Sequence, residues 1–163
     1  MAQDDVKLEF KKLINLIKLL KDGIPAVRVG IIGETANRNS GELNNAEIGF
    51  TNEFGKLTGY PKIPARSFLR MPLRSVQFKE KLHSKKSLSG KEFEKALKSG
   101  KGEEFAKLVG LVAEETIQEA FATNGFGQWK PNAPLTIELK KSSSPLIDTG
   151  QLRRAITSRV EKK

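Results

Sequence analysis

The chain has 163 residues and no cysteine, which fits a single domain with its own hydrophobic core and excludes disulfides and thiolate chemistry. Its one histidine, His83, excludes His-rich metal sites and any mechanism that needs two histidines. The N-terminus lacks an apolar run behind a basic start, and no apolar stretch approaches the roughly 20 residues of a membrane helix. We therefore expect a soluble, intracellular protein with no membrane partner.

The formal net charge of +10 is unevenly distributed. Residues 62–101 hold 12 Lys and Arg against 3 Asp and Glu, a net +9, whereas residues 102–139 hold 2 against 6, a net −4. The tail at 140–163 holds 7 against 2, a net +5. The basic segments could attract phosphate, but a solvated lysine-rich surface is the commoner meaning of such runs. They also lack the interleaved aromatic residues of a single-strand-binding platform.

The first third of the chain predicts a helix, a strand and a loop in that order. Residues 5–21 predict an amphipathic helix. The β-branched residues at 26–32, bounded by glycines, predict a strand. A polar loop at 33–45 follows, and residues 46–54 fit either a strand or a short helix. The apolar stripe of the N-terminal helix consists of Val6, Phe10, Leu13, Ile17 and Leu20.

The middle of the chain alternates loops and helices. A second loop at 56–64 precedes a helix at 67–82. Pro72 must lie in the first turn of that helix, because proline lacks the amide hydrogen that later turns need. After a polar linker, Ser87 or Ser89 can cap a further short helix.

The last third contains the most regular helix, at 103–122, with acidic residues in its first turn. A final helix is predicted at 151–158, capped by Asp148 or the following threonine, because Asp148 and Gln151 have the spacing of a capping box. Together the elements predict an α+β fold in one domain spanning 1–163. We expect a small, mostly antiparallel β-sheet packed against N-terminal, central and C-terminal helices, with long polar loops.

The Asp-Thr-Gly sequence at 148–150 is the one motif with a known catalytic use. In aspartic proteases, two such carboxylates share a proton to activate water, and a homodimer can build the pair from one copy per chain. In those enzymes, however, a flap and a second structural element follow the motif. Only 13 residues follow Gly150 here, so no flap is possible. We interpret the motif as the cap of the last helix.

Other candidate reactive groups lack partners. The glycines at 30 and 33 are not spaced as in a dinucleotide-binding loop. Glu53 could act as a general base, but no residue nearby completes a site. His83 is expected to be exposed in a Lys/Ser linker, and Trp129 to be a packing anchor. We therefore expect no enzyme activity, no cofactor and no metal site.

An ordered series of short segments follows the predicted strand at 26–32. Their order and number resemble the virion-morphogenesis and tail-completion proteins of tailed bacteriophages and prophages, over about residues 26–160. The long polar loop looks like an insertion into that pattern. The segments are Ala46–Ile48, Asn52–Gly55, Ile63–Arg70, Trp129–Ile137, the lysine and serine run at 140–144, and Pro145–Arg153 followed by Ile156.

The resemblance implies a structural subunit of the phage particle, located in the virion after assembly in the host cytoplasm. Such a subunit forms a homo-oligomeric ring, expected to be a hexamer, at the head–tail junction or the top of the tail tube, as a tail terminator. Its other partners would be neck or connector proteins and tail tube or sheath proteins, with passing contact to phage DNA. A head-completion or neck-adaptor subunit is the alternative within this class. A basic DNA-binding protein acting through 62–101 and 140–163 is the alternative from another class.

Assembly through complementary surfaces needs contact residues rather than catalytic ones. The loops at 34–45 and 56–64 are candidate contact arms, ordered by neighbouring subunits. The arginines in the matching segments could pair with acids on the next subunit or face DNA in the channel. The candidate interface or core residues are Glu53, Phe54, Arg66, Phe68, Arg70, Asp148, Leu152, Arg153 and Arg154.

Overall fold

The computed structural model describes residues 24–37, 43–56, 58 and 62–161, together with positions 7, 10, 11, 13, 14, 17 and 21. Its elements follow the order β1 (Val27–Ile31), η1 (Gly33–Ala36), α2 (Asn45–Phe54), α3 (Arg70–Arg74), α4 (Val76–Ser84), η2 (Lys86–Leu88), α5 (Gly90–Lys98), α6 (Gly102–Ala122), α7 (Pro134–Lys140), α8 (Gln151–Arg154) and β2 (Ile156–Val160). This is the small α+β fold that the sequence predicts. None of the described helices is long and apolar enough to cross a membrane.

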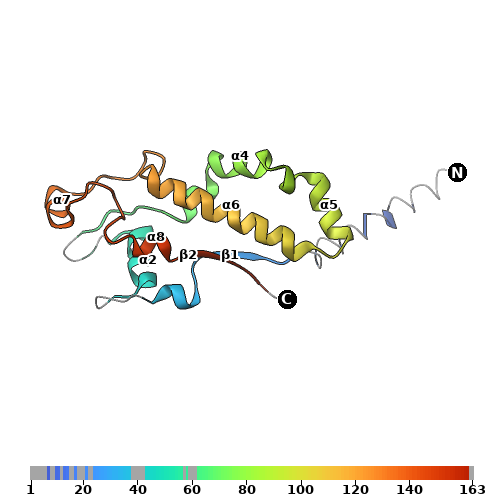
Figure 1. Ribbon diagram of the computed structural model, residues 1–163, viewed down its shortest axis with the longest axis horizontal. Helices are drawn as coiled ribbons and strands as arrows, with labels where there is room; N and C mark the ends of the chain where they lie inside the picture. The colour runs from blue at the N-terminus through green and yellow to red at the C-terminus, as the bar shows by residue number, and fades with distance from the viewer. Residues whose placement is uncertain are drawn as a thin grey trace.

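Helix α6 is the central element of an elongated molecule. Figure 1 shows it running along the long axis, with the β-sheet, α2 and α8 on one side and α4 and α5 on the other. The prediction of a helix over 103–122 is confirmed. Not every apolar side chain of α6 reaches the core: Leu108 is 38% exposed, while the small residues Ala106 and Gly110 are buried. Small side chains allow the sheet to approach, since a Cβ added at Gly110 would lie 2.5 Å from Ser158 Oγ.

The hydrophobic core forms where α6 meets the loop before α3 and the C-terminal segment. Phe68 and Ile117 are completely buried, and Phe68 packs against Phe121 with 5.6 Å between ring centroids. Trp129 stacks edge-on against Phe121 at 5.5 Å and is 8% exposed, which confirms its prediction as a packing anchor. Leu152 and the first residue of β2 complete the cluster.

The sheet consists of two antiparallel strands among the described residues. Val27 pairs with Val160 and Ile31 with Ile156, so β1 and β2 join the two ends of the described chain. The predicted strand at 26–32 is confirmed, but the helix predicted at 151–158 is wrong in its second half, because α8 stops at Arg154. The β-branched side chains of β2 suit a strand, and pairing with β1 outweighs the local helical pattern.

The ambiguous segment at 46–54 is helix α2. Its start is set by a capping box, in which Asn44 Oδ1 accepts from the Glu47 amide at 2.9 Å and Glu47 Oε2 accepts from the Asn44 amide at 2.9 Å. Two orphan amides at the helix start are thereby satisfied. The helix ends at Gly55, which is where the sequence predicts the end if this segment is a helix.

The helix predicted at 67–82 is two helices. The chain is extended at Ser75, whose hydroxyl accepts from the Phe78 amide and starts α4. Pro72 lies in the first turn of α3, as expected. Ser89 caps α5, which confirms the predicted short helix, and His83 is exposed in the last turn of α4.

Parts of the remaining predictions lie outside the described residues. The described positions in the predicted N-terminal helix are helical, and Phe10, Leu13 and Ile17 of its stripe are exposed. Val6 and Leu20 are not among the described residues. The same holds for 38–42 in the first candidate loop and for 57 and 59–61 in the second.

Candidate functional site

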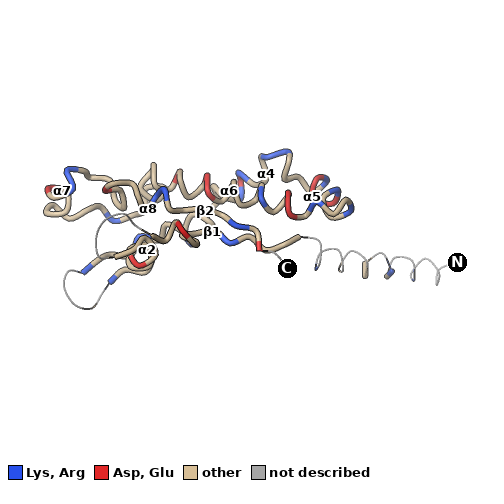
Figure 2. The backbone as a smooth tube through the Cα atoms, turned by 60° about the horizontal axis from the view of Figure 1, so that its bottom comes forward, with Lys and Arg blue, Asp and Glu red and all other residues tan. Residues whose placement is uncertain are grey.

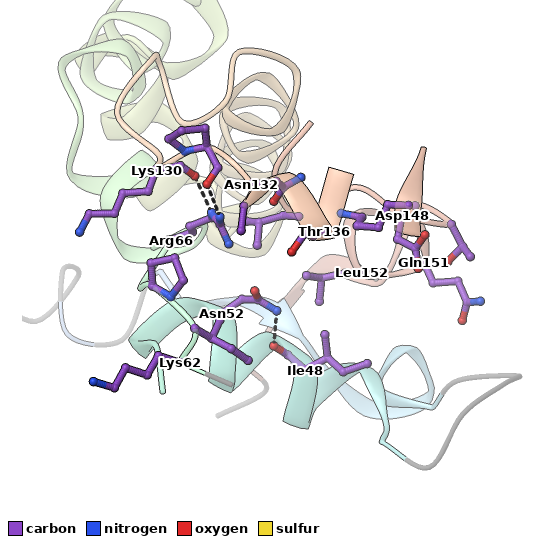
Figure 3. A pocket seen from close by; sticks show the side chains of 18 residues that line it. Ile48, Asn52, Lys62, Arg66, Lys130, Asn132, Thr136, Asp148, Gln151 and Leu152 are labelled. Atoms are coloured by element: carbon purple, nitrogen blue, oxygen red, sulfur yellow. Dashed lines mark hydrogen bonds between the residues drawn. The ribbon is translucent and has the colours of Figure 1, made fainter. Parts of the chain in front are cut away.

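The segments that carry the resemblance converge on one groove. Its cavity volume is about 710 Å³, and four stretches line it: α2, residues 62–66, residues 130–140 and residues 146–152. Figure 3 shows Ile48 and Asn52 on one wall, with Arg66, Thr136, Asp148 and Leu152 contributed by the other stretches. A volume of this size is typical of pockets that bind ligands or partner side chains.

Glu53 is buried behind the groove wall and stabilises it through hydrogen bonds. Its side chain is 4% exposed, and Oε2 accepts from the amides of Phe68 at 2.7 Å and Leu69 at 3.0 Å. The other oxygen, Oε1, accepts from Ser67 Oγ at 2.7 Å and from the amide and Nε of Arg70 at 3.2 and 2.8 Å. The carboxylate therefore satisfies the free amides at the start of α3 from a distant helix.

The pKa of Glu53 reflects two opposed effects. Burial alone would raise the pKa of this carboxyl, but hydrogen bonds from Ser67, Arg70 and the Leu69 amide outweigh burial and hold the pKa below its ordinary value. The group is thus ionised and fully engaged in the fold. These contacts lie within the fold, so Glu53 is a core residue, which is one of the assignments that the sequence leaves open for it.

Arg66 ties the groove wall to the stretch that follows α6. The side chain is 7% exposed; Nε donates to the carbonyl of Lys130 at 2.8 Å and Nη2 to that of Pro131 at 2.9 Å. Its own amide donates to Asn52 O at 2.7 Å. The two guanidinium bonds link segments that are 64 and 65 residues apart in the chain. Burial lowers the pKa of Arg66.

Gly55 makes the turn between α2 and the groove segment possible. Its backbone has φ +80° and ψ 169°, a region that is open essentially to glycine. A Cβ at this position would lie 2.8 Å from the backbone nitrogen of Ala65 and 2.9 Å from the carbonyl oxygen of Ile63. Backbone atoms cannot move away as a flexible side chain can.

Replacing Gly55 by alanine is therefore expected to lower the free energy of unfolding by about 2 kcal/mol or more. Chemical denaturation monitored by Trp129 fluorescence would measure the change. Gly90→Ala is the matched control, because a Cβ there meets no atom within 4 Å. Equal stability of the two variants would contradict the strained turn.

Two phenylalanines of the same region take opposite positions. Phe68 is in the core, whereas Phe54 is 49% exposed and stacks on Phe50, itself 68% exposed, with 4.8 Å between ring centroids. The guanidinium of Arg70 lies 4.3 Å from the centroid of the Phe54 ring while its Nε is held by Glu53. This exposed patch consists of aromatic rings and an arginine, residue types that are enriched at protein interfaces.

The prediction that Asp148 caps the last helix is wrong. Helix α8 is preceded by Gly150 in a left-handed conformation at φ 73°, and no side chain caps it. Asp148 is instead exposed at the edge of the groove. Across from it, burial lowers the pKa of Lys140, while the charge of Asp148 raises it and that of Arg66 lowers it.

The remaining predicted residues are used within the chain. Leu152 is 6% exposed and belongs to both the core and the groove floor. Arg153 Nε donates to Gln118 Oε1 at 2.6 Å, and Gln118 Nε2 donates back to the Arg153 carbonyl at 3.0 Å. Arg154 is exposed, and one of its amino groups donates to Thr149 O at 3.0 Å. All four candidate arginines thus make hydrogen bonds inside the subunit.

Two residues of the site are absent from the sequence-based set. Asn132 is 8% exposed and donates to the carbonyls of Ser143 and Ser144 at 3.3 and 3.2 Å, which fixes the loop before Asp148. Lys140 contributes the cation next to Arg66. Both lie in the segments on which the resemblance rests, but no periodicity or capping pattern in the sequence singles either residue out.

No family model, curated protein or solved structure matches this chain. The chemistry of the groove is therefore the main guide to what it does. Among the described residues, its lining includes Lys62, Arg66, Lys130 and Lys140 but only one carboxylate, Asp148, and no histidine. Within the described residues, no group of three or more His, Cys, Asp or Glu could hold a metal ion. Such a lining is suited to binding a ligand or the side chains of a partner.

Proposed function

We propose that the chain is a structural subunit of a tailed bacteriophage particle, which forms a ring at the head–tail junction or the top of the tail tube and acts by protein–protein assembly. The observation that carries the proposal is the convergence of the segments behind the resemblance. They surround one groove and are tied together by Glu53 and Arg66. Buried polar residues that shape a binding surface are consistent with a subunit that acts by assembly.

Exposed apolar side chains support the same conclusion. On α2, Phe50 and Phe54 are 68% and 49% exposed, and on α7, Leu135 and Leu139 are 62% and 76% exposed. Single exposed apolar residues are ordinary, but pairs on one helix mark surfaces that partners cover. A terminator ring and a head-completion or neck-adaptor ring both need such surfaces.

The alternative of a basic DNA-binding protein has weaker support. The basic region at 62–101 packs against acidic α6, where Glu115 binds both Lys81 at 2.7 Å and Lys85 at 2.9 Å. These contacts lower the pKa of Glu115 to about 2. Figure 2 shows basic and acidic positions interleaved along α4, α5 and α6, so this face is not uniformly positive. A duplex-binding surface needs unpaired cations facing outward.

The native mass of the purified chain, measured with negative-stain images of the same sample, tests the proposal. We expect a closed ring, with a hexamer as the specific expectation from the resemblance. A titration with duplex DNA across a range of salt concentrations is the companion measurement. A strictly monomeric protein whose affinity for DNA falls steeply with salt would contradict the proposal and favour the DNA-binding alternative.

A further inference from the structure

The groove has an uncompensated positive charge. Arg66 is 7% exposed and donates to two carbonyls, but no carboxylate among the described residues pairs with it. Lys62, Lys130 and Lys140 line the same groove, and Asp148 is the one carboxylate that lines it in the part of the chain that the structure describes. A guanidinium removed from water without a counter-ion costs free energy. An incoming carboxylate would recover part of that cost.

The rest of the groove is apolar. Ile48, Ile63, Leu146 and Leu152 line it, so it presents aliphatic surface between its cations. The chemistry that fits is a short segment with a carboxylate between aliphatic side chains. Small anions alone would leave the aliphatic surface uncovered, whereas a protein segment would cover both parts.

Helix α7 carries a segment of this chemistry on its outer side. Leu135 and Leu139 are 62% and 76% exposed, and Glu138 between them is exposed and without an ion pair among the described residues. Residues three and four apart share one face of a helix, so these side chains form one patch. Thr136 and Lys140 of the same helix line the groove. Figure 1 places α7 at one end of the elongated molecule, where a neighbour can reach it.

We propose that Leu135, Glu138 and Leu139 of α7 in one copy occupy the groove of a second copy. The Glu138 carboxylate then faces the cations that line that groove, Arg66, Lys130 and Lys140. This contact deepens the proposed function and rests on it. Each copy offers both the outer face of α7 and the groove, and the two are different surfaces. The contact is therefore heterologous, and its repetition from copy to copy builds a ring if the rotation closes.

Charge reversal tests the contact. Glu138→Lys and Lys130→Glu are each expected to raise the dissociation constant of the oligomer about tenfold or more, because each places like charges in the contact. The double variant restores opposite charges and is expected to recover most of the assembly. Glu80→Lys is the matched control, since Glu80 is an exposed acid on α4, away from the groove lining. Native mass across a concentration series reads out all four proteins.

Cross-linking provides a second, geometric readout. The chain contains no cysteine, so single cysteines can be placed without background. A mixture of the Glu138→Cys and Lys130→Cys variants, treated with a short bismaleimide, is expected to give mixed dimers, whereas Glu80→Cys with Lys130→Cys is not. This readout holds even if a charge-reversed variant folds poorly.

The possible results distinguish a failure of this contact from a failure of the proposed function. A wild-type oligomer that is unchanged by Glu138→Lys and gives no mixed cross-link overturns the contact and leaves the ring proposal standing. A wild-type protein that stays monomeric and yields no mixed cross-link at the highest attainable concentration counts against both. Loss of assembly in both single variants, with recovery in the double variant, supports the contact.

Discussion

Replacing Glu53 by glutamine is expected to lower the free energy of unfolding by about 3 kcal/mol at neutral pH. The carboxylate accepts from three backbone amides, one hydroxyl and one guanidinium nitrogen, and it is 4% exposed. Glutamine offers one acceptor oxygen and turns an NH₂ group toward backbone donors. At least one buried amide then loses its partner, and Arg70 loses its counter-ion.

The same residue predicts a pH dependence. Because the pKa of Glu53 is lowered in the folded protein, its contribution is present above the ordinary carboxyl pKa of 4.5. The contribution is lost as pH falls through the lowered folded value. Glutamine does not titrate at this position, so the stability difference between the two proteins should shrink below about pH 4.5. Urea unfolding at neutral pH and in acid measures the difference at each pH.

Glu80→Gln serves as the control for both measurements, since Glu80 is exposed and its replacement is expected to change the stability by less than about 0.5 kcal/mol. If Glu53→Gln were as stable as the wild-type protein at neutral pH, the carboxylate would not organise the start of α3.

Replacing Phe68 by alanine is expected to cost about 4 kcal/mol of unfolding free energy. The ring is completely buried against Ile117 and Phe121, so truncation removes its apolar contacts and leaves a cavity. Phe54→Ala is the matched control: this ring is 49% exposed, and its loss is expected to cost about 1 kcal/mol or less. Thermal and urea unfolding of both variants would compare the effects.

The two phenylalanines stand 14 residues apart in the segments behind the resemblance, where the sequence assigns both to core or interface. The structure places Phe68 in the core and Phe54 at the surface. Comparing the stabilities of the two alanine variants checks this difference. A larger loss for Phe54→Ala than for Phe68→Ala would reverse the assignment. If Phe54 contributes to a contact between copies, its variant would show weaker assembly with near-normal stability.

Features governed by local signals were predictable from the sequence. The periodic apolar positions of α6, the serine cap of α5 and the position of Pro72 in the first turn of α3 all depend on residues within a few positions of one another. The strand at β1 followed from its β-branched run between glycines. The α+β class follows from these elements together.

The candidate site was only partly predictable. The segments that form the site were recognisable by their order, but the roles of the individual residues could not be predicted. Glu53 was left between general base, interface and core, because its five donors lie 14 to 17 residues away. Asp148 had the spacing of a capping box, yet the left-handed backbone of Gly150 placed it at the edge of the groove instead.

The sequence by itself determined the helices whose periodicity and caps are local, the lack of disulfides and the excess of positive charge. Only the tertiary structure decided that Ile156–Val160 is a strand, since its partner β1 begins 129 positions before Ile156. It also decided that Arg66 is buried against Lys130 and Pro131 and that one groove joins four stretches. Such pairings depend on packing between residues far apart in the chain, and no local periodicity records them.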